Sequence, residues 1–111
     1  MSALIVFATT PNEKIAKNIA EELLNARLAA CVSIQGPVLS LFHWEDEVKE
    51  ESEILLIIKT NEKAFIKLEA LIKAHHPYDV PEIIASSITH ANSAYLEWID
   101  KTLTKENRCN L

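Results

Sequence analysis

The chain has 111 residues, of which 49% are hydrophobic and one is glycine, so a linker or low-complexity chain is excluded. The net charge of −5 argues against non-specific binding to nucleic acid or to anionic membranes. The length predicts a single domain over residues 1–111, with residues 104–111 as a polar, frayed tail.

The N-terminal apolar run is too short to span a bilayer, and no basic segment precedes it, so we expect no membrane insertion. The two cysteines, Cys31 and Cys109, form no C-x-x-C pair. This usage suits a reducing compartment and predicts a cytoplasmic location. Cys31 lies in an apolar run and is expected to be a small buried side chain.

The first part of the chain predicts a strand followed by a helix. An unbroken apolar run over residues 3–8 is typical of a strand that is covered on both faces. Thr10 is the expected N-cap of the helix, with Pro11 at its first position and Glu13 completing a capping box. The helix then repeats apolar residues along one face until about residues 26–28.

Two long strands come next. Residues 29–35 and 38–44 predict one strand with a glycine–proline pair in its middle, where proline favours a bulge or a bend. An acidic turn over 45–47 leads to a third strand over 48–60, which is polar at first and then continuously apolar. Both strands exceed the usual length of about five or six residues, so the hairpin must extend beyond a small sheet.

The last part predicts a helix, a strand and a short helix. The second helix opens at 60–62 and ends at about His75, because Pro77 keeps the residue before it out of the α region. Pro81 suits the first residue of a strand, which continues over 82–85. The final short helix carries an apolar stripe at Tyr95, Trp98, Ile99 and Leu103.

This order predicts an α+β fold, a ferredoxin-like split βαβ sandwich with an added C-terminal helix. Right-handed crossovers place both main helices on one face of the sheet. The first and third strands are apolar on both faces, and each fully buried Ile or Leu contributes roughly 1.5–3 kcal/mol. We therefore expect an oligomer whose subunits cover one another's second sheet face and exchange edge contacts through the hairpins.

The adjacent histidines His75 and His76 are the sharpest chemical feature of the sequence. Imidazole suits Cu(II) and Zn(II), and the available carboxylate partners are Glu82, Asp79 and, across a subunit boundary, Glu45 and Asp46. The alternative is structural, because a helix C-terminus favours a protonated histidine by roughly 0.3–1 kcal/mol. Adjacent side chains of an extended segment also point to opposite sides, which hinders one metal from taking both.

The chain resembles the CutA-type divalent-ion tolerance proteins from Val6 to Ile99. Six segments carry the resemblance in order, namely Thr10–Glu13 with Ala16, Leu28–Val32, Trp44–Glu45, Glu53–Ile54 through Ile57–Thr60, His75–Tyr78 with Val80–Ile83, and Tyr95–Leu96 with Trp98–Ile99. The resemblance implies a ferredoxin-like subunit in a stable homotrimer, generally cytoplasmic in bacteria and similar in architecture to the PII signalling proteins. It also implies a role in tolerance of copper and other divalent cations.

Members of this family have been proposed to bind copper through a cysteine at the end of the first strand and the paired histidines. The histidines correspond to His75 and His76, whereas the cysteine position is Ala8, which has no ligand atom. With Glu82 as the added ligand and no thiolate, we expect modest and pH-dependent affinity for Cu(II) or another divalent cation. Two further departures, at positions where members often have glycine, are Asp46 and Ala91.

The sequence therefore predicts a non-enzymatic, metal-binding homotrimer that serves copper tolerance. One alternative is a PII-like signalling trimer that binds a small ligand between subunits, although no glycine-rich phosphate loop is present. Another is a purely structural or assembly module, in which the packing anchors are Trp44, Tyr78, Tyr95 and Trp98. No nucleophile elbow, H-E-x-x-H motif or recognisable Cys–His pair marks an enzyme.

Overall fold

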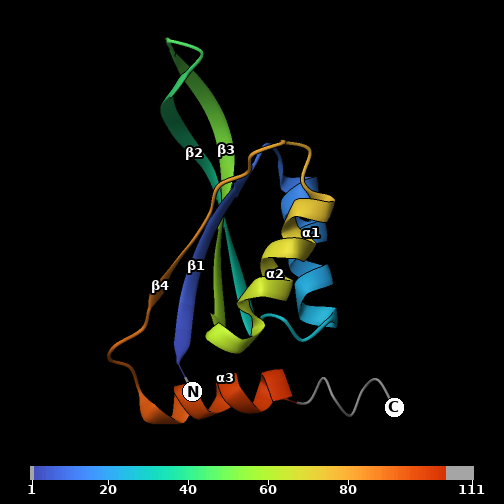
Figure 1. Ribbon diagram of the computed structural model, residues 1–111, viewed down its shortest axis with the longest axis vertical. Helices are drawn as coiled ribbons and strands as arrows, with labels where there is room; N and C mark the ends of the chain where they lie inside the picture. Colours follow the sequence, from blue (N-terminus) through green and yellow to red (C-terminus); the bar gives the residue numbers. More distant parts are fainter. Residues whose placement is uncertain (1, 105–111) are drawn as a thin grey trace.

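The computed structural model describes residues 2–104, and its elements follow the predicted order (Figure 1). The chain forms β1 (Ala3–Thr10), α1 (Glu13–Asn25), β2 (Cys31–Trp44), β3 (Glu47–Asn61), α2 (Glu62–His75), β4 (Ile83–Ser87) and α3 (Ser93–Thr104). Of the tail predicted over 104–111, only Thr104 is described, as the last residue of α3. The rest of that tail, including Cys109, lies outside the described residues.

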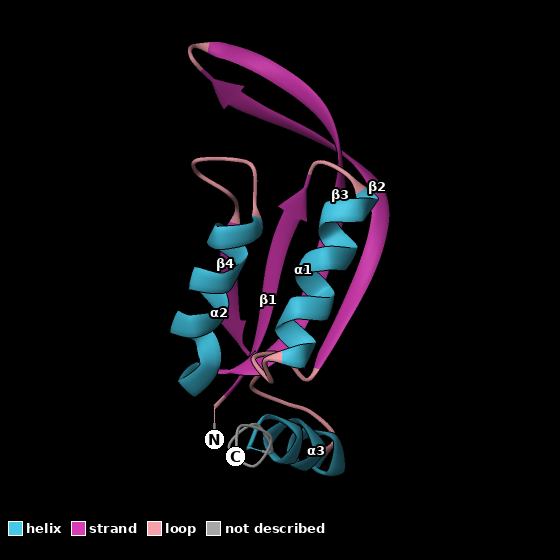
Figure 2. Cartoon of the chain, turned by 90° about the vertical axis from the view of Figure 1, so that its right-hand side faces the viewer, coloured by secondary structure: helices cyan, strands magenta, loops and turns pink. Residues whose placement is uncertain are grey.

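The four strands form one sheet in the order β2-β3-β1-β4, and every neighbouring pair is antiparallel. Helices α1 and α2 lie side by side on one face of this sheet, and α3 lies across its lower end (Figures 1 and 2). The predicted split βαβ fold with an extra C-terminal helix is therefore confirmed. The predicted fourth strand is displaced along the chain, because its pairing with β1 begins at Ile83 and not at Pro81.

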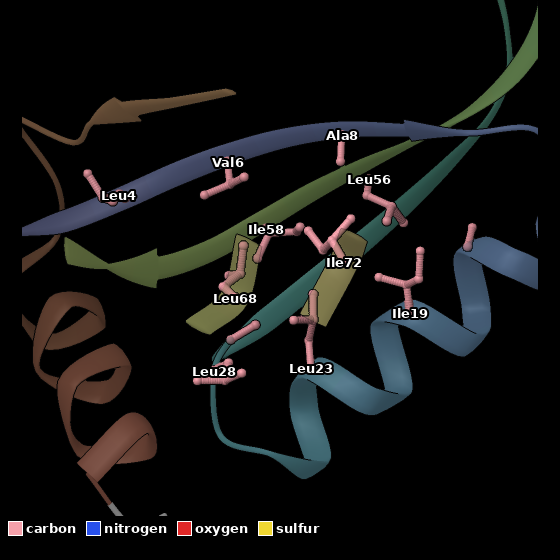
Figure 3. Close-up of a cluster of buried hydrophobic side chains, with 12 residues drawn as sticks. Leu4, Val6, Ala8, Ile19, Leu23, Leu28, Leu56, Ile58, Leu68 and Ile72 are labelled. Carbon is pink, nitrogen blue, oxygen red and sulfur yellow. The ribbon is translucent and has the colours of Figure 1, made fainter. Parts of the chain in front are cut away.

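The core lies between the sheet and the two main helices (Figure 3). Alternate residues of β1 and β3 point to this side, as the two-residue period of a strand requires. They meet helix residues spaced three or four positions apart, which share one helix face. The fully buried side chains of this cluster include Val6, Ala8, Ile19, Leu23, Leu56, Ile58, Leu68 and Ile72.

The start of α1 differs from the prediction. Asn12, and not Thr10, is the N-cap, and its Oδ1 accepts a hydrogen bond from the backbone N–H of Ile15 at 2.9 Å. Thr10 cannot take this role because it still belongs to β1, where it pairs with Ile54 and is fully buried. Its hydroxyl donates instead to the Asn12 carbonyl at 3.0 Å, so the predicted capping box of Thr10 with Glu13 is wrong.

The hairpin of β2 and β3 extends well beyond the rest of the sheet (Figure 1). β1 pairs with β3 only from Asn61 to Ile54, so Glu47–Glu53 pair with β2 alone. The tip is a two-residue turn in which Glu45 and Asp46 have φ of 52° and 64°. Two successive positive φ values are typical of a type I′ turn, and aspartate tolerates this region better than most residues.

The strand predicted to be interrupted in its middle is one continuous element with an irregularity. The register of β2 against β3 shifts between Gln35 and Val38, and the Gly36–Pro37 peptide bond is cis. β2 also begins at Cys31 and not at residue 29. Cys31 is half-buried, since it lies on the edge strand opposite Lys59, and the prediction of a buried cysteine is wrong.

The second face of the sheet is largely uncovered by this chain. Many of the side chains that alternate with the core residues are apolar, and helix α3 packs against β1 and β3 at one end of the sheet (Figure 2). Ile84 is 55% exposed, and the same sheet face carries Ile5, Phe7, Leu55 and Ile57, all half-buried. The hairpin adds exposed Leu39, Leu41, Trp44 and Val48. The apolar surface expected from the sequence is therefore present.

Candidate functional site

The histidine pair lies where α2 ends. His75 is the last helical residue, and His76 has extended backbone angles of φ −101° and ψ 138°. Pro77 explains this ending, because its ring disfavours helical angles at the preceding residue. The change of backbone direction gives the two imidazoles different surroundings, since His75 is exposed and His76 is only 8% exposed.

His75 keeps one ring nitrogen available for a ligand. Its Nδ1 lies 3.0 Å from the Leu71 carbonyl oxygen one turn earlier in α2. A carbonyl can only accept, so Nδ1 carries the hydrogen and Nε2 presents a lone pair. Histidines that bind metals commonly donate their other N–H to a carbonyl in this way, which fixes the tautomer. The geometry therefore prepares His75 Nε2 to bind a cation from solvent.

His76 uses both ring nitrogens within the protein. The backbone N–H of Tyr78 donates to Nδ1 at 3.1 Å, so Nδ1 carries no hydrogen. Nε2–H then donates to the Thr9 carbonyl at 2.8 Å, at the far end of β1. The imidazole also contacts the Tyr78 ring, with centroids 4.8 Å apart. His76 thus ties the α2–β4 connection to β1, and it can bind a metal only if one of these hydrogen bonds breaks.

Ala8 occupies the position where the resemblance places a cysteine. Its side chain is fully buried and faces the helices within the core (Figure 3). It contributes no ligand atom. A cation bound at the histidine junction would therefore have nitrogen and oxygen ligands only.

Glu82 and Asp79 lie on a cleft of about 840 Å³ between the hairpin and the α2–β4 connection. Residues of β1, β2, β3 and the connection line it, namely Thr9, Ser40, Leu41, Phe42, Trp44, Lys49, Glu51, Glu53, Tyr78, Asp79, Val80 and Glu82. Neither His75 nor His76 is among them. Within residues 2–104, no three His, Cys, Asp or Glu side chains are grouped closely enough to hold a metal ion.

Negatively charged side chains predominate in the lining of the cleft. Four carboxylates line it against the single ammonium of Lys49, whose Nζ is 3.6 Å from Glu47 at the outer end of β3. Burial raises the pKa of the Tyr78 hydroxyl, and the negative charges of Glu53 and Glu51 raise it further. The phenol therefore lies within the field of both carboxylates.

Sequence reasoning missed Glu53 and Glu51, because hairpin charges usually face solvent. The available signal is their spacing, since residues two apart on a strand share a face and Glu51 and Glu53 follow Lys49 at that interval. The pairing places these residues opposite Ser40, Val38 and Phe42. The spacing does not predict that the α2–β4 connection lies opposite these residues and forms the other wall of the cleft.

The four aromatic side chains expected to be packing anchors are all partly exposed in this chain. Trp44 is 53% exposed at the hairpin end, and Trp98 of α3 is 45% exposed. Tyr95 stacks on Trp98 with centroids 5.6 Å apart. Burial raises the pKa of Tyr95, with a further contribution from Cys31 beside it. These rings are available for contacts beyond the chain itself.

Comparison with known proteins gives one family. The family model described as CutA1 divalent ion tolerance protein matches residues 4–102. The divalent-cation tolerance protein CutA of Thermus thermophilus is 46% identical over 95 residues, which cover 86% of this chain and 92% of that protein. The chloroplastic CutA 1 of rice is 42% identical over 105 residues, which cover 95% of this chain but only 59% of that protein.

Solved structures agree with this result. The Thermus thermophilus Cut A1 structure has a TM-score of 0.86 at 45% identity and covers 87% of this chain and 94% of that chain. The rice CutA1 structure has a TM-score of 0.89 at 40% identity, with 92% and 94% covered. A CutA from Archaeoglobus fulgidus, described as periplasmic, has a TM-score of 0.88 at 36% identity, with 91% and 98% covered. In residues 2–104, no helix has the length and apolar character needed to cross a membrane.

Proposed function

Because the chain belongs to the CutA1 divalent ion tolerance family, we propose that it is a non-enzymatic protein that binds divalent cations, copper among them, as a homotrimer. The family takes its name from tolerance of ions and not from a reaction. The observation that carries the cation-binding part is the free Nε2 of His75, oriented by the hydrogen bond between Nδ1 and Leu71.

The uncovered sheet face supports assembly with other copies of the chain, and the number of three copies is what the family resemblance implies. Ile5, Phe7, Ile57 and Ile84 form an apolar surface beside a hairpin that projects beyond the sheet. Burial of such side chains contributes roughly 1.5–3 kcal/mol each, so covering the face with other copies of the chain is strongly favoured. The unpaired edges of β2 and β4 offer backbone groups for the same contacts.

For the cation we propose His75 as the first ligand, with His76 and Glu82 as additional ligands. Imidazole nitrogen with carboxylate oxygen is a suitable donor set for Cu(II) or Zn(II). His76 joins only after it releases Tyr78 or Thr9, and Glu82 faces the cleft on which neither histidine lies. Assembling the three ligands therefore requires movement of the connection 77–82, and we expect modest affinity.

Titration calorimetry with CuCl₂ on the full chain tests this site. The His75→Ala variant should lose copper binding, and a matched control is His90→Ala. His90 is also exposed, and its Nδ1 is engaged by the Thr89 hydroxyl at 2.9 Å. Copper binding should also weaken in acidic solution, because protons compete with the cation for the imidazole nitrogens. Unchanged copper affinity in His75→Ala would remove the assignment.

The cleft gives the small-ligand alternative a specific basis. Its volume of about 840 Å³ is within the range of small-molecule sites, and it combines aromatic walls with a few charged groups. A binding role of the PII-like kind would therefore use the hairpin side of the α2–β4 connection. The cytoplasmic location remains a prediction, since relatives are described as chloroplastic and as periplasmic.

A further inference from the structure

The cleft between the hairpin and the α2–β4 connection has walls suited to an organic cation. Three aromatic rings, those of Phe42, Trp44 and Tyr78, line it. Aromatic faces attract cations and also provide apolar contact. Four carboxylates complete the lining, from Glu51, Glu53, Asp79 and Glu82.

Glu53 is the residue that points most directly to a ligand. It is 7% exposed. Among the described residues, it has no hydrogen-bond partner and no ion-pair partner. Every fully enclosed side-chain oxygen of the described residues has a hydrogen-bond partner. Because the Glu53 carboxylate has none, its oxygens must be accessible from the cleft that Glu53 lines. Because only a small part of this side chain is exposed, a cation placed beside its carboxylate would compensate for the solvation that it has lost.

The arrangement does not suit a bare metal ion. Among residues 2–104, no three acidic or histidine side chains are grouped closely enough to hold one. Glu51 and Glu53 are instead successive residues on one face of β3, so their backbone positions are roughly 6.8 Å apart. That separation matches a ligand with two positive charges joined by a short methylene chain.

We propose that this cleft binds a linear aliphatic polyamine, with protonated amines at Glu51 and Glu53 and the methylene chain against the aromatic rings. The net charge of −5 attracts such a ligand to the protein. Lys49 pairs with Glu47 and marks the outer limit of the acidic part of the cleft. Neither His75 nor His76 lines the cleft, so Glu82 is the one residue that this proposal shares with the proposed copper site.

Titration calorimetry of the full chain with spermidine at low ionic strength tests the proposal. Glu51→Gln and Glu53→Gln should each weaken spermidine binding by about tenfold, which corresponds to roughly 1.4 kcal/mol per charge lost. The matched control is Glu50→Gln, because Glu50 is the neighbour of Glu51 on the opposite face of β3 and its change removes the same charge. This control should bind spermidine like the original chain.

Two further measurements separate the proposal from simpler explanations. Butylamine, which has one amine on the same kind of chain, should bind at least tenfold more weakly than butane-1,4-diamine. The His75→Ala variant should keep its spermidine affinity even where copper binding is lost. Absence of spermidine binding, equal weakening in Glu50→Gln, or loss of spermidine binding in His75→Ala would each overturn the proposal. Circular dichroism of every variant confirms that the fold is intact.

Discussion

Replacing His76 by alanine should destabilise the protein, whereas the same replacement at His75 should not. His76 is 8% exposed and connects the α2–β4 segment to β1 through its two ring nitrogens. The two hydrogen bonds contribute about 0.5–1.5 kcal/mol each. The alanine variant also leaves the Thr9 carbonyl and the Tyr78 N–H without these partners.

The expected loss follows from these contacts. An unsatisfied buried group costs about 1–3 kcal/mol, and the ring contact with Tyr78 is lost as well. We expect His76→Ala to lower the unfolding free energy by about 2–4 kcal/mol. The exposed His75 has one hydrogen bond within its own helix, so His75→Ala should change stability by at most about 0.5 kcal/mol.

Guanidinium denaturation followed by far-ultraviolet circular dichroism measures both variants against the original chain. All samples need the same protomer concentration, because the stability of an oligomer depends on concentration. The copper titrations should give the reverse order, with His75→Ala the more damaging change. Equal denaturation midpoints for the two alanine variants would show that the two His76 hydrogen bonds do not stabilise the junction.

Two more predictions concern the tyrosines and the helix caps. Tyr78 and Tyr95 are the only tyrosines, and the pKa of each is raised above 10. The ultraviolet titration of tyrosinate should therefore occur at higher pH than that of free tyrosine. In Glu53→Gln, the pKa of Tyr78 should move toward that of free tyrosine. Since the unfolded phenols ionise first, the unfolding free energy should fall as the pH rises above about 10, and a flat profile there would contradict the shifts. Removing the buried cap of α2 in Asn61→Ala should cost about 1–2 kcal/mol in thermal or chemical unfolding, more than removing the exposed cap of α1 in Asn12→Ala. Equal losses would show that the link from Asn61 to α3, through Asp100 at 3.5 Å, contributes nothing.

Most of the fold could be predicted because its signals are local. Apolar periodicity distinguishes strands from helices, and Pro77 fixes the end of α2 whatever the rest of the chain does. The start of α1 could not be fixed in this way, because Thr10 and Asn12 are both good cap residues. The choice depends on how far β1 pairs with β3, which is a property of the assembled sheet.

The candidate site was predictable only in part, for the same reason. The sequence identifies two adjacent histidines but not their partners. Thr9, which accepts the hydrogen bond from His76, is 67 positions away in the chain, and only the sheet topology brings it to the end of α2. Glu53 likewise resembles an ordinary hairpin charge until the α2–β4 connection folds over it. Side-chain chemistry was therefore visible in the sequence, while burial and hydrogen bonding were not.

The most direct test of the account is sedimentation equilibrium of the full chain at micromolar concentration. We expect other copies of the chain to cover the exposed apolar face of Ile5, Phe7, Ile57 and Ile84 beside the projecting hairpin. We expect a species with three times the 12.5 kDa mass of the chain, stable on dilution. A monomer of 12.5 kDa with this apolar face open to solvent would contradict the account.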